Sequence, residues 1–190
     1  MYLRRLGESL ADAGVALLEY RNKIGTDSEI LADAVILRAA MPQRNIKLIL
    51  DDRVDLVDKL EFDGVHVDSG DVSPSEARGL LGLGRIVGTF GGSESLVPGI
   101  LKEPADYFSI GPVYPTATKQ TTKASIGPQG VSRLREQAGP DVVLVAVGGI
   151  TFESAPLVLA AGASTVAVSA AIFRTSNPAA EFRRWRSALN

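Results

Sequence analysis

The chain has 190 residues, and its 20 Lys and Arg residues against 22 Asp and Glu residues leave a net charge of −2. This balance argues against a nucleic-acid-binding surface, because a basic stripe along one face needs a clear excess of Lys and Arg. The hydrophobic content of 45% with only 6% aromatic residues predicts a core of aliphatic side chains in one domain spanning residues 1–190.

Cysteine is absent from the sequence, which excludes disulfides, thiolate catalysis and cysteine-ligated zinc. The single histidine leaves few other transition-metal sites. Apolar runs stay short of the roughly 18 residues that a membrane helix needs, and the charged N-terminus has no hydrophobic region of a signal peptide after it. We therefore expect a cytoplasmic protein without a membrane partner.

Short aliphatic runs alternate with amphipathic stretches along the whole chain. The amphipathic stretches predict helices, several opened by a capping Asp, Ser or Thr, over Tyr2–Ala13, Ser28–Ala40, Val54–Glu61, Pro74–Leu81, Gly92–Leu101, Gly130–Ala138, Phe152–Ala161 and Pro178–Leu189. The aliphatic runs predict strands over Gly14–Tyr20, Lys47–Leu50, Gly64–Val67, Arg85–Gly88, Tyr107–Ile110, Val142–Val147 and Thr165–Val168.

This alternation is typical of α/β folds built on a parallel sheet. Because the series begins on a helix, we predict a (β/α)8 TIM barrel whose first strand is missing from this sequence, with an open doubly wound sheet as the alternative. Loss of one strand would expose the edges of Gly14–Tyr20 and Thr165–Val168. A partner chain could cover that gap, or the natural protein could begin further upstream, so a homo-oligomer is a mild expectation.

The segment Gly111–Lys119 carries the strongest functional signal. Pro112 and Pro115 turn the backbone out of the preceding strand, which places the hydroxyls of Thr116 and Thr118 beside the ammonium of Lys119. Two hydroxyls and one cation at the carboxyl end of a strand suit a phosphate group. Ordinary turn chemistry is the alternative for this loop taken by itself.

Charged side chains lie at the end of the strand Gly14–Tyr20 and directly after it. Glu19, Arg21 and Lys23 alternate in sequence and so share one face of an extended chain. Such a triplet inside a barrel is costly unless it meets the charge of a ligand. A solvated strand terminus is the alternative.

Carboxylates follow the next two strands. Asp51 and Asp52 come after Lys47–Leu50, and Asp71 lies beyond Gly64–Val67. Oxygen ligands on adjacent strand ends suit Mg²⁺, and Asp68 adds negative charge nearby. The alternative role of Asp52 and Asp71 is to cap helices.

Small residues follow the last two strands, with Gly149 after one and Val168 and Ser169 after the other. Glycine allows close approach of the backbone to an anion, and barrels place a phosphate site after strands seven and eight. His66 lies in an apolar strand, and we interpret it as a hydrogen-bonded core residue rather than a catalytic one.

The ordered set of motifs resembles the thiamine phosphate synthase family from about Leu10 to Pro178. The matching segments are Arg21–Lys23, Asp52–Leu56, Asp63–Val67 with Asp71, Gly111–Lys119, Ala146–Ile150 and Ala167–Ile172. Members of that family join a hydroxymethylpyrimidine diphosphate to a hydroxyethylthiazole phosphate and release pyrophosphate.

The resemblance implies a role for each matched position. Asp52 and Asp71 would hold Mg²⁺, and Arg21, Lys23 and Lys119 would contact the diphosphate. The thiazole phosphate would be bound by Thr116, Thr118, Gly149, Val168 and Ser169.

The match is incomplete at three positions, where the family's Gln, Asn and Ser are replaced by Glu19, Asp51 and Phe90. We assign Glu19 and Asp51 to the substrate-binding residues. Because an ionised carboxylate cannot donate a hydrogen bond to a diphosphate, we expect reduced synthase activity. The alternatives are a thiazole tautomerase-like enzyme, a thiazole-phosphate binder without catalysis, and a barrel enzyme acting on another phosphorylated substrate.

Overall fold

The computed structural model describes residues 2–42, 46–116 and 123–189. Every predicted strand is present, although several are shorter or longer than the aliphatic runs suggested. They are β1 (Leu17–Tyr20), β2 (Lys47–Asp51), β3 (Gly64–Val67), β4 (Ile86–Gly92), β5 (Tyr107–Ile110), β6 (Leu144–Val147) and β7 (Thr165–Ala167).

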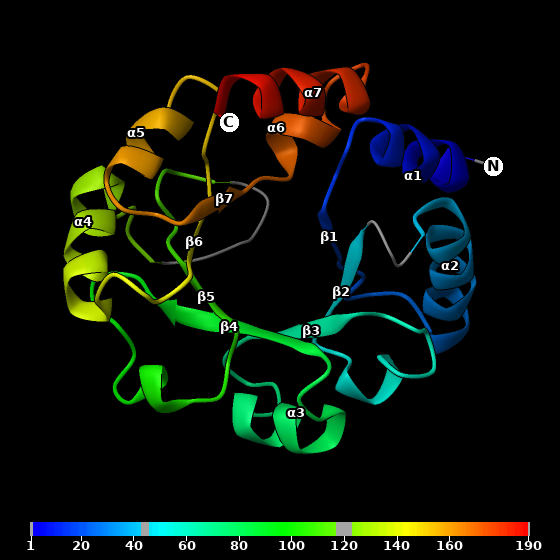
Figure 1. Cartoon of the computed structure of the whole chain (residues 1–190), viewed down its shortest axis with the longest axis horizontal. Coiled ribbons are helices and arrows are strands. Elements are labelled where there is room, and N and C mark those ends of the chain that lie inside the picture. Colours follow the sequence, from blue (N-terminus) through cyan, green and yellow to red (C-terminus); the bar gives the residue numbers. More distant parts are fainter. Residues whose placement is uncertain (1, 43–45, 117–122, 190) are drawn as a thin grey trace.

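The strands form one parallel sheet in the order β1-β2-β3-β4-β5-β6-β7, each paired with the next along the chain. Figure 1 shows the sheet curling around a central axis with the helices outside it. In the described part of the chain β1 and β7 do not pair, so they form the two edges of the sheet. The α/β class with a parallel sheet is therefore confirmed, whereas a closed barrel is not.

The helices pack around the outside of the sheet. They are α1 (Tyr2–Asp12), α2 (Asp27–Ala40), α3 (Pro74–Leu81), α4 (Gly127–Ala138), α5 (Ala155–Ala160), α6 (Ala170–Phe173) and α7 (Pro178–Leu189). Capping boxes open two of them, with Thr26 and Glu29 at α2 and Ser73 and Glu76 at α3. Each box satisfies backbone N–H groups that have no partner within the helix.

Two predicted helices are wrong. Over 54–61 only Val54–Leu56 forms a short 3-10 turn (η1), and over 92–101 only Ile100–Lys102 does (η2). The second error arises because β4 continues to Gly92 and Gly99 adopts a left-handed conformation with φ of 80°. A helix over Phe152–Ala161 is confined to α5, and α6 was not predicted.

The core lies between the sheet and the helices in two clusters. In one cluster Leu48 and Leu50 of β2 pack with Ile30 of α2, and the other joins β5 and β6 to Trp185 of α7. Side chains alternate along a strand, so Ile49 and Asp51 of β2 face the opposite way, toward the interior. Parallel register aligns Glu19 with Ile49 and Asp51 with His66, which places polar residues on this inner side.

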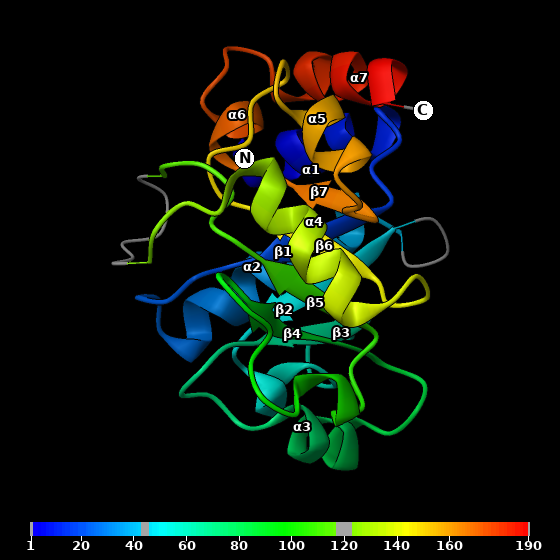
Figure 2. The same ribbon diagram turned by 90° about the vertical axis from the view of Figure 1, so that its left-hand side faces the viewer.

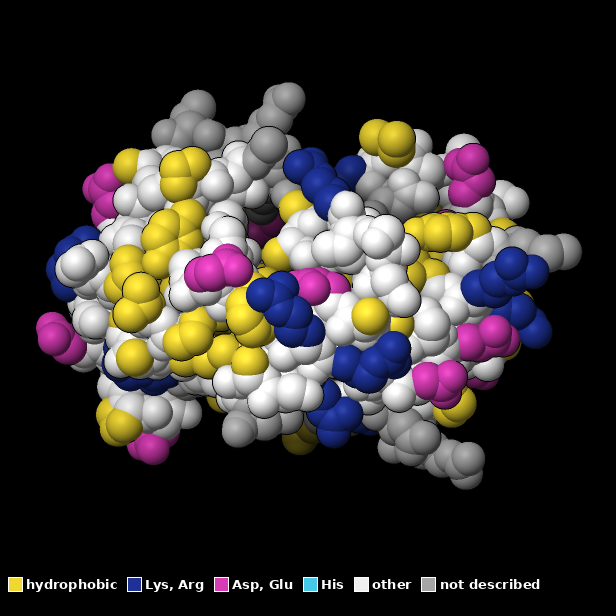
Figure 3. Space-filling view, turned by 90° about the horizontal axis from the view of Figure 1, so that it is seen from above, with side chains coloured by type: hydrophobic (Ala, Val, Ile, Leu, Met, Phe, Trp, Pro, Cys, Tyr) yellow, Lys and Arg dark blue, Asp and Glu magenta, His cyan; other side chains and the backbone are white. Residues whose placement is uncertain are grey.

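Helices α1 and α7 lie next to each other near the two sheet edges, where Arg186 donates to the carbonyl of Ala13 over 3.3 Å. Figure 2 shows the sheet between α7 at one end of the molecule and α3 at the other. The face seen in Figure 3 mixes basic, acidic and hydrophobic side chains. Among the described residues, no helix combines the length and apolar character needed to cross a membrane.

Candidate active site

The loop after β1 carries Arg21 and Lys23 and is held by polar contacts at both ends. The Oδ1 atom of Asn22 accepts from the backbone N–H of Gly25 over 2.8 Å, and its Nδ2 donates to the hydroxyl of Tyr20 over 3.2 Å. Burial raises the pKa of Tyr20 to about 12, helped by its 2.7 Å hydrogen bond to Asp33. The turn is therefore anchored to both β1 and α2.

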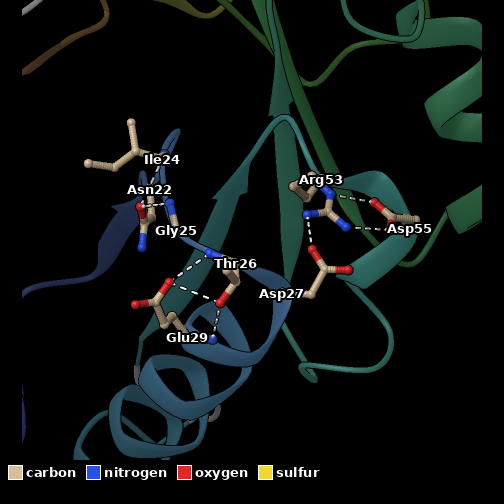
Figure 4. Close-up of polar contacts among 8 residues, drawn as sticks. All are labelled: Asn22, Ile24, Gly25, Thr26, Asp27, Glu29, Arg53 and Asp55. Atoms are coloured by element: carbon tan, nitrogen blue, oxygen red, sulfur yellow. Dashed lines mark hydrogen bonds and ion pairs between the residues drawn. The ribbon is translucent and has the colours of Figure 1, made fainter.

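Arg53 ties the start of α2 to the loop after β2. Its Nη1 contacts Asp27 at 2.5 Å, while Nε and Nη2 form a two-bond contact with Asp55 at 3.0 and 2.8 Å. Figure 4 shows this bridge beside the capped start of α2, with Ile24 pointing away from both. The hydrogen bonds with Asp55 and Asp27 raise the pKa of Arg53, so its charge is permanent. The bridge joins the two loops that carry the charged residues of the site.

The charged residues at the ends of β1 and β2 converge. Arg21 Nη1 lies 2.5 Å and Lys23 Nζ 2.9 Å from Oδ2 of Asp51, and Lys23 also pairs with Asp52. The Asp51 side chain is 1% exposed, whereas those of Arg21 and Lys23 are 39% and 38% exposed. One oxygen of each aspartate, Oδ1, is buried without a hydrogen-bond partner among the described residues. From the sequence we expected these residues at the same end of the sheet. The sequence did not indicate that they form ion pairs with one another.

The helix-capping alternative for the aspartates is wrong. Asp52 adopts a left-handed backbone with φ of 66°, and the residue before η1 is Arg53, which makes no side-chain cap. Asp71 Oδ2 accepts from the backbone N–H of Asp68 over 2.7 Å, and Ser73 caps α3 instead. Left-handed backbone is strained for a residue with a side chain and often occurs at functional sites.

The inner side of β3 and β5 contains a pair that sequence reasoning did not assign to the site. His66 Nδ1 lies 3.1 Å from the hydroxyl of Tyr107, and the two rings stack with centroids 5.5 Å apart. Burial raises the pKa of Tyr107, and the nearby carboxylates of Glu19 and Asp51 raise it further. Glu19 and Asp51 therefore act on the same inner space, and Tyr107 stays protonated at neutral pH. The contact of His66 with Tyr107 agrees with the prediction of a hydrogen-bonded core histidine. The sequence pattern did not indicate that Tyr107 lies at this site.

The loops after β5 and β6 lie against each other. Tyr114 N–H donates to Gly148 O over 3.0 Å, and a Cβ on Gly149 would lie 2.4 Å from Pro115 O. Gly149 has φ of +65°, so the chain here needs glycine for both its conformation and its space. Thr116 follows this contact directly, so the structure supports the predicted proximity of the two loops. Thr118 and Lys119 lie outside the described residues.

The remaining predicted residues are spread over neighbouring strands. Val168 and Ser169 follow β7, which pairs with β6, and Ser169 precedes α6 with its side chain exposed. Phe90 of β4 lies under the ammonium of Lys123, whose Nζ is 3.6 Å from the ring centroid. A ring thus occupies a position where the resemblance led us to look for a hydroxyl.

The arrangement is that of a parallel α/β protein with a cationic and carboxylate cluster after β1 and β2 and a glycine-lined loop pair after β5 and β6. Such strand ends bind phosphorylated ligands in folds of this class.

Comparison with known proteins agrees with this class. Residues 2–172 match the family described as thiamine monophosphate synthase. The thiamine-phosphate synthase of Agrobacterium fabrum is 34% identical over 191 residues, which cover 99% of this chain and 87% of the relative. That of Koribacter versatilis is 38% identical over 168 residues, covering 88% of this chain and 78% of the relative. The chain therefore belongs to the thiamine monophosphate synthase family.

Solved structures support the fold. A thiamine phosphate pyrophosphorylase from Pyrococcus furiosus superposes with a TM-score of 0.79 at 24% identity, over 98% of this chain and 88% of that one. A 3-hexulose-6-phosphate synthase superposes with a TM-score of 0.72 at 17% identity, over 99% and 93% of the two chains. At these identities the likeness concerns the arrangement of strands and helices.

Proposed function

We propose that this chain joins hydroxymethylpyrimidine diphosphate to hydroxyethylthiazole phosphate and releases pyrophosphate. The observation that carries this proposal is the convergence of Arg21 and Lys23 at the strand ends of a chain that belongs to the thiamine monophosphate synthase family. Two cations on the rim of a parallel sheet suit a leaving group that gains negative charge.

The reaction needs little covalent chemistry from the protein. The bond between the pyrimidine methylene carbon and the diphosphate oxygen breaks, and the electron pair leaves with pyrophosphate. The thiazole nitrogen then donates its lone pair to the methylene carbon. Arg21, Lys23 and Lys119 stabilise the charge on the departing group, and the remaining site holds the two rings in reach of each other.

Mg²⁺ is proposed as the cofactor, with Asp52 and Asp71 as its protein ligands. The buried Oδ1 of Asp52 has no hydrogen-bond partner among the described residues, which fits a metal ligand. Within residues 2–42, 46–116 and 123–189 no three His, Asp or Glu side chains form a metal-binding group. Mg²⁺ is suited to such a site because it commonly takes one or two carboxylates and completes its shell with water and phosphate. When bound, it would offset negative charge on the diphosphate.

The thiazole phosphate is proposed to bind across the β5, β6 and β7 loops, at Thr116, Thr118, Gly149, Val168 and Ser169. The close backbone contact between Pro115 and Gly149 supports this assignment, because it brings the first two of these loops together.

We also propose a barrel arrangement, an oligomeric state and a cellular location for this protein. We infer a (β/α)8 barrel-like arrangement, and a homo-oligomer is consistent with β1 and β7, which do not pair with each other in the described part of the chain. The lack of cysteine suits the cytoplasm. Relatives named as synthases support the synthase over the tautomerase alternative.

The test is calorimetric titration with the pyrimidine diphosphate, with and without Mg²⁺, followed by addition of thiazole phosphate and assay of released pyrophosphate. Metal-dependent binding with turnover is expected, at a rate lowered by Glu19, Asp51 and Phe90. Binding of thiazole phosphate without any diphosphate binding would contradict the proposal.

A further inference from the structure

The cations that the proposed function assigns to the diphosphate already have anionic partners. Arg21 and Lys23 both contact Oδ2 of Asp51, and Lys23 also contacts Asp52. An incoming diphosphate therefore competes with these carboxylates for the same two cations. The Asp51 side chain is 1% exposed and lies at the end of β2, so its carboxylate stays next to these cations rather than in solvent.

The same carboxylates carry unused ligand positions. Oδ1 of Asp51 and Oδ1 of Asp52 are buried and lack hydrogen-bond partners within the described part of the chain. A buried charged oxygen without a partner is costly, and a cation is its natural complement. The end of β2 carries two successive carboxylates, Asp51 and Asp52. The resemblance leads us to expect only one aspartate there, because Asp51 stands where the family has asparagine.

We propose that Asp51 exchanges partners: its Oδ2 holds Arg21 and Lys23 when no ligand is bound, its Oδ1 is open to a divalent cation, and the whole carboxylate becomes available to that cation when a diphosphate takes Arg21 and Lys23. The inference rests on the proposed function and adds a residue-specific coupling to it. Asp51 repels the diphosphate in the absence of metal and favours the metal–diphosphate pair when both are present. Binding of the two ligands is therefore synergistic, and Asp51 is the residue that makes it so.

The test uses Mn²⁺ and inorganic pyrophosphate as probes, because both can be measured without turnover. Free Mn²⁺ is followed by electron paramagnetic resonance, and pyrophosphate binding is followed by calorimetry, first with a chelator present and then with metal. For Asp51→Asn we expect binding of Mn²⁺ alone to weaken about tenfold and metal-free pyrophosphate binding to tighten about tenfold, the scale expected for removing one charge from a partly solvated cluster. Opposite changes in the two affinities distinguish an exchange of partners at Asp51 from a general loss of structure, which would weaken both.

A second variant tests the exchange from the cation side. Lys23→Gln removes a half-exposed partner of both carboxylates, so Mn²⁺ alone should bind more tightly and pyrophosphate more weakly than in the unmodified chain. Asp58→Asn is the matched control, because Asp58 is an exposed aspartate that pairs only with Arg85 among the ion pairs of the described residues. It should change neither affinity.

Loss of both affinities in Asp51→Asn, or no change in Mn²⁺ binding, would overturn the inference. The thermal midpoint of each variant shows whether the fold is retained, and Lys23→Gln decides the matter if Asp51→Asn does not fold. If the unmodified chain turns over substrates but shows no synergy between metal and pyrophosphate, only this inference falls. If it binds no pyrophosphate with metal present, the proposed function falls as well.

Discussion

Asp63 provides a test of how the amino ends of the strands, at the opposite end of the sheet from the candidate site, are stabilised. Its side chain is 5% exposed and accepts hydrogen bonds from the backbone N–H of Leu48 at 2.9 Å, from Arg38 at 2.8 Å and from Lys47 at 3.1 Å. Truncation to alanine leaves the buried Leu48 N–H without an acceptor, at a cost of about 1–3 kcal/mol. It also deprives the largely buried Arg38 of its counterion, and breaking such a pair costs about 3–5 kcal/mol in total.

We therefore expect Asp63→Ala to lower the free energy of unfolding by about 4 kcal/mol. Urea unfolding followed by fluorescence measures this directly, because Trp185 is the single tryptophan and is 4% exposed. Asp58→Ala is the control, since the exposed pair of Asp58 with Arg85 should contribute less than about 1 kcal/mol. Equal costs for the two variants would refute the reasoning.

The pH dependence of the same variant supplies a second check. Burial raises the pKa of Asp63, but the hydrogen bonds from Leu48, Arg38 and Lys47 outweigh it and hold the pKa below its usual 3.8. A lowered folded-state pKa means that the charged carboxylate stabilises the fold above the unfolded pKa and loses this effect as pH falls through the folded value. The difference between the unmodified chain and Asp63→Ala should therefore be constant near neutrality and shrink below about pH 4. A difference that grows on acidification would show that the sign is wrong.

Four further results are expected from the proposed site. Removal of divalent metal with EDTA should stop pyrophosphate release, and Mg²⁺ should restore it; release that continues in EDTA would contradict the metal assignment. Glu19→Gln should tighten binding of the pyrimidine diphosphate in calorimetry, because it removes a negative charge from the inner side of β1. Phe90→Ser should raise the turnover rate by restoring a hydroxyl, and an unchanged rate would separate Phe90 from the site. Gly149→Ala should weaken thiazole phosphate binding and spare the diphosphate, because a Cβ would approach Pro115 O to 2.4 Å at a φ that costs about 1–2 kcal/mol for other residues.

Local pattern was a good guide to the strands and a poor guide to two helices. The aliphatic runs at Lys47–Leu50 and Tyr107–Ile110 became β2 and β5 because a buried strand needs only a short apolar segment. The stretch 92–101 has some amphipathic character, yet hydrogen bonds with β5 extend β4 to Gly92. Sheet pairing accounts for Gly92, which the sequence pattern assigned to the helix, and Pro98 with the left-handed Gly99 interrupts helical structure before η2.

For the site, the sequence by itself determined which charged and small residues stand at strand ends, since that depends only on where apolar runs stop. Glu19, Arg21, Asp51 and Gly149 could be named in this way. Only the tertiary structure decided that Asp51 holds Arg21 and Lys23, because these contacts join β1 to β2 across 30 and 28 positions of the chain and depend on the parallel register of the two strands. The physical reason is that ion pairing requires atoms within a few ångströms of each other, and for residues far apart in sequence that distance is set by the fold.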